Sequence, residues 1–134
     1  MASIIQVEGI GEAFAEKLRA AGIQTTDALL EAGATPKGRL EIEEKTGIAH
    51  SLILEWVNHV DLWRIKGVAE EYSDLLEEAG VDSCPELAQR RSDHLFAKLV
   101  AVNQEKQLVR RLPTQSQVAN WIEQAKLLPR MVTH

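Results

Sequence analysis

Apolar residues recur at helical intervals along almost the whole chain, and glycine, proline, serine and threonine interrupt the pattern. Phe14, Leu18 and Ala21 lie on one face of a predicted helix that begins near Gly11 and ends at Gly22. The same spacing, with capping and stop residues, predicts further helices over 25–33, 35–47, 51–63, 69–79, 83–91, 92–109 and 116–128. Strand patterns are scarce, so we expect an all-α fold of about eight short helices.

Two stretches of the chain align with each other without a gap. VEGIGEAFAEKLRAAGI (7–23) matches IKGVAEEYSDLLEEAGV (65–81) at an offset of 58, which pairs Gly9 with Gly67. The helix predicted over 51–63 matches the one over 116–128 at an offset of 65, which pairs Trp56 with Trp121. The sequence therefore indicates a tandem repeat with about seven residues inserted in its second copy, from 65 − 58.

The boundary between the two copies falls near Arg64. No stretch rich in glycine, serine or proline marks it. We therefore predict one repeat over residues 1–64 and another over 65–134, packed together as one unit.

Each repeat contains the pattern apolar, any residue, Gly, apolar, and then a helix. Glycine reaches positive φ and lets another chain approach closely, so it suits a tight hairpin. Ile10 and Val68 are expected to turn inward and anchor their hairpins. The amides that follow the glycines are expected to face outward at a helix N-terminus, where an anion such as a phosphate oxygen is favoured.

The first hairpin resembles the helix-hairpin-helix motif. VEGIGEAFAEKL carries the motif in full, with Ala15 and Leu18 in its last places, whereas IKGVAEEYSDLL has Ala69 for the second glycine and Ser73 for the alanine. Nearly the whole chain resembles a bacterial, often cyanobacterial, family of uncharacterised domains made of two such repeats. The resemblance implies a SAM-domain-like, pseudo-symmetric fold. In many helix-hairpin-helix proteins the hairpin amides grip a DNA backbone phosphate without reading the sequence.

A full motif also needs a helix before its hairpin. The second hairpin follows the helix predicted over 51–63, but only MASIIQ precedes Val7. We therefore expect the helix predicted over 116–128 to fold back and pack before the first hairpin.

The two hairpins differ in the charge of the residues that flank them. The net charge is −5, which counts against tight, charge-driven nucleic-acid binding. Glu8 and Glu12 flank the first hairpin and repel phosphate, whereas Arg64 and Lys66 flank the second, although Glu70 and Glu71 follow it. The predicted nucleic-acid contacts are Arg64, Lys66, Gly67, Val68 and Ala69 at the second hairpin and Gly9, Ile10 and Gly11 at the first.

Other basic residues and tryptophans have two interpretations. The Arg90–Arg91 and Arg110–Arg111 pairs, with Lys37 and Arg39, either converge beside Lys66 or pair with neighbouring carboxylates, and we favour pairing. Trp56 and Trp121 are predicted to lie in the core rather than to stack on bases. Trp63, next to the second hairpin, is a candidate for contact with a partner.

Residue patterns for catalysis are weak. No Cys/His cluster has metal-binding spacing, and no nucleophile elbow, Walker loop or dinucleotide fingerprint is present. A single cysteine, Cys84, excludes an intramolecular disulfide and fits a reducing compartment. With no signal-peptide pattern and no apolar run of about 18 residues, we expect a cytoplasmic protein without membrane contact. From the missing motifs we expect no cofactor, no metal and no enzymatic activity.

Two functions are consistent with these sequence features. The first is weak, sequence-nonspecific binding of a DNA or RNA backbone through the hairpin amides. The alternative is a protein-interaction adaptor whose hairpins are purely structural. With either function, we expect the protein to be a monomer or a weak dimer.

Overall fold

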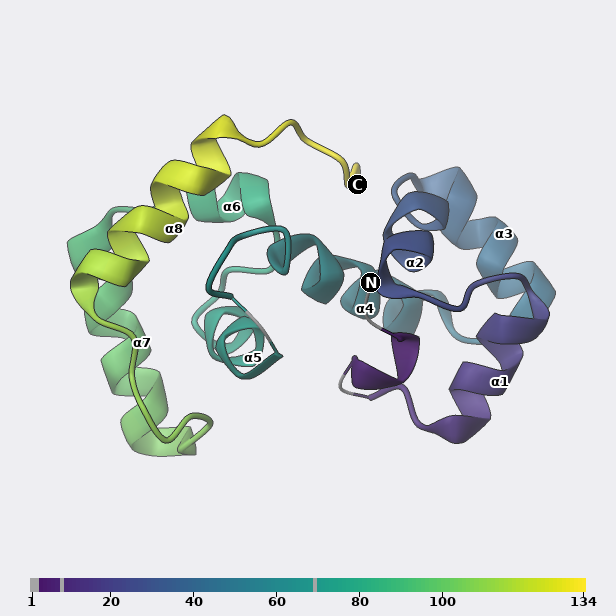
Figure 1. The fold of residues 1–134 in the computed structure, drawn as a ribbon, viewed down its shortest axis with the longest axis horizontal. Helices are drawn as coiled ribbons and strands as arrows, with labels where there is room; N and C mark the ends of the chain where they lie inside the picture. Colours follow the sequence, from purple (N-terminus) through teal and green to yellow (C-terminus); the bar gives the residue numbers. More distant parts are fainter. Residues whose placement is uncertain (1–2, 8, 69) are drawn as a thin grey trace. The chain divides into compact units, whose positions relative to one another are not determined.

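The computed structural model describes residues 3–7, 9–68 and 70–134, and the described residues confirm the all-α prediction. They form eight α-helices and one 3-10 helix; their only β-type pairing is an isolated bridge between Ser3 and Thr25. None of these helices has the length and apolarity needed to span a bilayer. The chain divides into unit 1, Met1–Asp61 with Met131–His134, and unit 2, Leu62–Arg130 (Figure 1).

Unit 1 contains the helices whose ends the sequence predicted best. Thr25 and Thr35 each accept a hydrogen bond from a backbone amide at a helix start, and Gly47 ends a helix with φ +73°. These are the capping and stop positions that the pattern predicted. The elements are η1 (Ile4–Gln6), α1 (Glu12–Ala20), α2 (Thr26–Ala32), α3 (Pro36–Thr46) and α4 (His50–Leu62).

In unit 1, buried residues of α4 pack against α1 and against the turn that follows α2. Trp56 and Val57 are buried on α4, as the sequence predicted for Trp56. The Trp56 ring lies 5.3 Å from the ring of Phe14 on α1. Gly33, which follows α2, lies so close to α4 that a Cβ at this position would stand 2.5 Å from Val57 Cγ2.

Arg39 has a structural role that the sequence did not predict. Its side chain is buried on α3, where one guanidinium nitrogen donates to Gly33 O at 2.8 Å and the other to Thr133 O at 2.6 Å. Thr133 N donates to Ala34 O at 2.8 Å, and Val132 is fully buried. Arg39 therefore holds residues 131–134 in unit 1 and does not belong to a surface cluster.

In unit 2, α8 runs beside α6 and α7 (Figure 1). It packs against both of these helices, and α7 also packs against α5. The core includes Leu76, Leu87, Leu99 and Trp121, of which Trp121 was predicted to be buried. The elements are α5 (Glu70–Glu78), α6 (Cys84–Ala88), α7 (Ser92–Lys106) and α8 (Gln115–Leu127).

One prediction about these helices is wrong. The helix starting at Ser92 ends at Lys106 rather than residue 109, because Gln107 takes the left-handed conformation with φ +51°. The last helix lies in unit 2, where its Trp121 stands beside Gly67, while Trp56 of α4 stands beside Gly9 in unit 1. That the last helix packs before the first hairpin stays a prediction.

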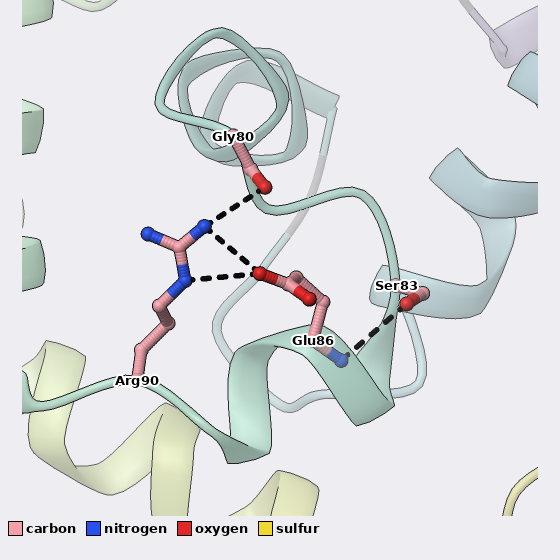
Figure 2. A network of polar contacts seen from close by, with 4 residues as sticks. All are labelled: Gly80, Ser83, Glu86 and Arg90. Atoms are coloured by element: carbon pink, nitrogen blue, oxygen red, sulfur yellow. Dashed lines mark hydrogen bonds and ion pairs between the residues drawn. The ribbon is translucent and has the colours of Figure 1, made fainter.

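Ser83 and Glu86, three residues apart at the start of α6, have the spacing of a capping box, which forms only in part. Figure 2 shows Ser83 Oγ accepting the Glu86 amide at 3.4 Å, while the Glu86 carboxylate turns to Arg90, whose Nη2 lies 2.9 Å away. Arg90 also donates to Gly80 O at 3.0 Å. A complete capping box forms instead at α8, between Thr114 and Gln117.

Gly38 provides a test of this packing. A Cβ at Gly38 on α3 would lie 2.1 Å from Ala32 O, a backbone atom that cannot move cheaply. We expect Gly38→Ala to destabilise the protein by about 1–3 kcal/mol, although alanine is the better helix former by about 1 kcal/mol. Urea unfolding followed by circular dichroism measures this change.

Gly11→Ala is the matched control for that experiment. A Cβ at Gly11 meets nothing within 4 Å, and its φ of −83° suits any residue. A neutral Gly38→Ala, or an equal loss in both variants, would contradict the packing described here.

Candidate functional site

The second hairpin is a tight turn over Ile65–Val68. Val68 N donates to Ile65 O at 3.1 Å, and Gly67 has φ +98°. The side chains of Ile65 and Val68 are buried, which confirms that Val68 anchors the hairpin. Lys66 and Gly67 are exposed between these two anchors, so they form the apex of the turn.

The indole of Trp121 packs against Gly67 at this apex. A Cβ on Gly67 would lie 3.0 Å from Trp121 Nε1, so only glycine fits at this position without displacement. The Tyr72 ring on α5 packs against the same indole at 5.3 Å. The glycine therefore allows both the positive φ and the close approach of Trp121.

Gln124 fixes the backbone of Lys66. The Gln124 Oε1 atom accepts Lys66 N–H at 2.8 Å, and Gln124 Nε2 donates to Lys66 O at 3.1 Å. Nε2 also donates to Asn120 Oδ1 at 2.8 Å, which orients the amide group. With its backbone held on both sides, Lys66 projects from a fixed turn.

Arg64 contributes differently from what the sequence predicted. Arg64 Nη2 donates to Pro129 O at 2.7 Å, so this guanidinium braces the segment that follows α8. Ala69, the last predicted contact at this hairpin, lies outside the described residues. The predicted pair of cations at the apex is thus reduced to Lys66.

The first hairpin has similar local geometry. Gly9 has φ +91°, and a Cβ on it would lie 3.1 Å from Trp56 Nε1. Ile10 is buried, as predicted, and its N–H donates to Val7 O at 3.0 Å. Gly11 is the N-cap of α1, and no side chain caps that end of the helix.

These turns correct one part of the predicted chemistry. We expected the amides after the glycines to face a ligand, but the Ile10 and Val68 amides donate to carbonyls within their own turns. The candidate site at the second hairpin therefore depends on the Lys66 ammonium and the exposed backbone of Gly67.

A carboxylate lies at the start of the helix that follows the first hairpin. Glu12, in the first turn of α1, keeps 73% of its side chain exposed, and its carboxylate lies 3.4 Å from Arg19 Nη1. A carboxylate at a helix N-terminus takes the place that a bound anion would favour. Glu8, on the other side, lies outside the described residues. The first hairpin is therefore the poorer anion site.

The Arg90–Arg91 pair is neutralised within the protein. Arg90 binds Glu86, and Arg91 Nη2 lies 3.1 Å from Asp93 Oδ2, which confirms the paired interpretation for both arginines. The amide of His94 and the charge of Arg91 hold the pKa of Asp93 below its usual value. Lys37 remains exposed on α3.

Arg110 and Arg111 differ from those pairs. Both are exposed, and neither makes an ion pair with any residue that the structure describes. The interpretation favoured from the sequence, pairing with neighbouring carboxylates, therefore does not hold for these two arginines among the described residues.

Several polar contacts near the site were not found from the sequence. Trp63 is half-buried, and its Nε1 donates to Ser73 Oγ at 2.9 Å. Ser73, which stands where the motif has alanine, thus offers the Trp63 indole an acceptor that alanine would lack. The internal alignment showed this substitution, but only the fold shows that Trp63 reaches it.

The chain belongs to a family described as Domain of unknown function (DUF4332), which matches residues 8–128. Neither a curated protein nor a solved structure matches the chain.

Replacing Gln124 tests the contacts that hold the apex. We expect Gln124→Ala to speed hydrogen exchange at the Lys66 amide up to about tenfold, because that amide loses a hydrogen bond with a net value of about 0.5–1.5 kcal/mol. Amide exchange measured by NMR gives the rate for this one group.

Glu123→Ala, on the neighbouring position of α8, serves as the control. Its carboxylate contacts Lys126 rather than the hairpin, so the Lys66 rate is expected to stay unchanged. Equal protection of the Lys66 amide in Gln124→Ala and the parent chain would show that Gln124 does not hold the turn.

Proposed function

We propose that this member of the DUF4332 family is a noncatalytic module that binds the phosphodiester backbone of nucleic acid weakly and without sequence preference. Binding takes place at the second hairpin. The proposal rests on the apex of that turn, where Lys66 is exposed beside Gly67 and makes no ion pair with the described residues. A fixed cation beside exposed backbone is suited to a phosphate oxygen.

We further propose that the two hairpins are helix-hairpin-helix repeats. Three features that the two hairpins share support this interpretation. Each hairpin has a glycine at positive φ, an indole within about 3 Å of where that glycine's Cβ would stand, and an aromatic ring 5.3 Å from that indole. The tryptophans, Trp56 and Trp121, are also the pair matched by the internal alignment.

The acidic net charge is compatible with this proposal. At physiological salt the Debye length is about 8 Å, so exposed carboxylates farther away have little effect on a phosphate at the apex. The local surroundings of Lys66 decide the interaction. Glu71, exposed in the first turn of α5, opposes it, which is one reason to expect weak binding.

A second candidate function is a protein-interaction adaptor. One observation favours it. Leu127, in the last turn of α8, leaves 86% of its surface exposed, more than any other large apolar side chain among the described residues. Single exposed apolar residues are common on soluble proteins, so this feature carries less weight than the hairpin apex.

Charge reversal at the apex tests the proposed function. We expect the parent chain to bind a fluorescein-labelled 20-nucleotide duplex with a Kd near the nonspecific range of about 10⁻⁴–10⁻⁶ M. Lys66→Glu is expected to raise that Kd about tenfold, because it replaces attraction at the apex with repulsion. Fluorescence anisotropy at several salt concentrations measures both the Kd and its salt dependence.

Lys45→Glu makes the same charge change on α3 of unit 1, where the lysine is also exposed. A small effect there with a large one at Lys66 would locate binding at the hairpin. Equal effects at both positions, or no binding by the parent chain at low salt, would refute the proposal, and the second of these would favour the adaptor.

A further inference from the structure

We propose that residues 108–114, here named the arginine loop, form a second phosphodiester-binding element that presents Arg110 and Arg111. This inference rests on the proposed function and extends it. It assigns a ligand contact to a segment outside both hairpins.

The side chains of the arginine loop divide clearly into anchors and exposed cations. Val109 and Pro113 are buried, and Leu108 and Leu112 pack partly buried against the core of unit 2. Arg110 and Arg111 are exposed between these anchors. The loop is therefore held on both sides, with two guanidinium groups at its centre.

Hydrogen bonds fix the backbone of the same loop. Asn103, on the last turns of α7, accepts Val109 N–H at 3.0 Å and donates to Val109 O at 3.1 Å. Gln107, just before the loop, adopts φ +51°, which turns the chain away from the helix axis. At the other end, the capping box between Thr114 and Gln117 fixes the entry to α8.

A chain of contacts connects the arginine loop with the second hairpin. Tyr72 Oη donates to Arg111 O at 3.0 Å. The ring of Tyr72 packs on Trp121, and Trp121 lies directly against Gly67 at the apex. The loop and the hairpin are thus two parts of one packed arrangement within unit 2.

Unit 1 lacks this element. Only residues 48–49 separate Gly47, which ends α3, from α4, whereas residues 108–114 separate Gln107 from α8. The internal alignment also pairs Tyr72 with Phe14, which has no hydroxyl group. The added residues and the added hydroxyl therefore occur together, and the hydroxyl binds the backbone of Arg111.

Arginine is chemically suited to the proposed ligand. Its planar guanidinium can donate two parallel hydrogen bonds to one phosphate, and it remains charged at any physiological pH. Because the loop backbone is already fixed, binding has to order only the arginine side chains. Two adjacent arginines without ion pairs among the described residues favour contact with a polyanion over a structural role.

The test measures how the affinity for duplex DNA depends on salt, with single-stranded RNA of equal length as a second probe. We expect the double variant Arg110→Gln, Arg111→Gln to reduce the slope of log Kd against log salt by about 1.8 for the duplex, or about 0.9 for each lost phosphate contact. Lys66→Gln is measured in parallel and is expected to reduce it by about 0.9. A similar reduction with the RNA would show that the shared phosphodiester is recognised.

Two further variants separate binding from folding. Arg91→Gln with Lys98→Gln removes the same charge from exposed positions on or beside α7, and it is expected to leave the slope unchanged. Tyr72→Phe is expected to keep the fold, because Phe14 packs on Trp56 at the same ring distance, and to raise the Kd about twofold by loosening the loop. Thermal unfolding confirms that each variant is folded.

The outcomes distinguish this inference from the proposed function. A slope that changes with Lys66→Gln but not with the double arginine variant would overturn the arginine loop and leave the hairpin site intact. An equal change in the double variant and its charge-matched control would also overturn the loop, because it would show a diffuse charge effect. No binding of either probe by the parent chain would overturn both proposals.

Discussion

The close approach of an indole to a glycine is the constraint on which both hairpins depend. At Gly9 and Gly67 a Cβ would stand 3.1 Å and 3.0 Å from the Nε1 atom of a buried tryptophan. Both glycines also have a positive φ, +91° at Gly9 and +98° at Gly67, where other residues are strained. Each tryptophan comes from a helix far along the chain, so the turn is stabilised by tertiary packing rather than by local sequence alone.

This constraint determines which groups of the second hairpin reach the surface. With Trp121 against one side of Gly67 and Ile65 and Val68 buried on either side, Lys66 is left outside. One departure of this hairpin from the helix-hairpin-helix motif adds a polar contact, because Ser73 accepts a hydrogen bond from Trp63. Tyr72, which stands where the first repeat has Phe14, donates a hydrogen bond to the arginine loop.

Helix type and helix ends could be predicted because they depend on neighbouring residues. Thr35 and Gly47 have their effects within one turn, so the sequence was sufficient to place the ends of α3. The burial of Trp56 and Trp121 followed from apolar periodicity in the same way. The eight helices and the two buried tryptophans were therefore accessible without coordinates.

Features that join distant residues were not accessible. Gln124 looks like any polar residue on a helix surface, and only the fold brings it to the backbone of Lys66. The alignment shows which helices correspond, but only the fold shows that Trp56 lies beside Gly9 and Trp121 beside Gly67. The turn amides of Val68 and Ile10 were assigned to a ligand because their acceptor carbonyls could not be seen in the pattern.

Arginine residues show why the basic content of a sequence is a poor guide to anion binding. Burial lowers the pKa of Arg39, yet an arginine stays protonated in proteins, and its charge is directed at the carbonyls of Gly33 and Thr133 inside unit 1. Arg90 is held by a carboxylate, and such a cation would have to break an existing contact to meet a phosphate. Arg110 and Arg111 have no such contact to break among the described residues, and the loop backbone is already held by neighbours. In a chain of net charge −5, the cations without ion pairs among the described residues, rather than the total charge, are therefore the groups from which any attraction for a polyanion is to be expected.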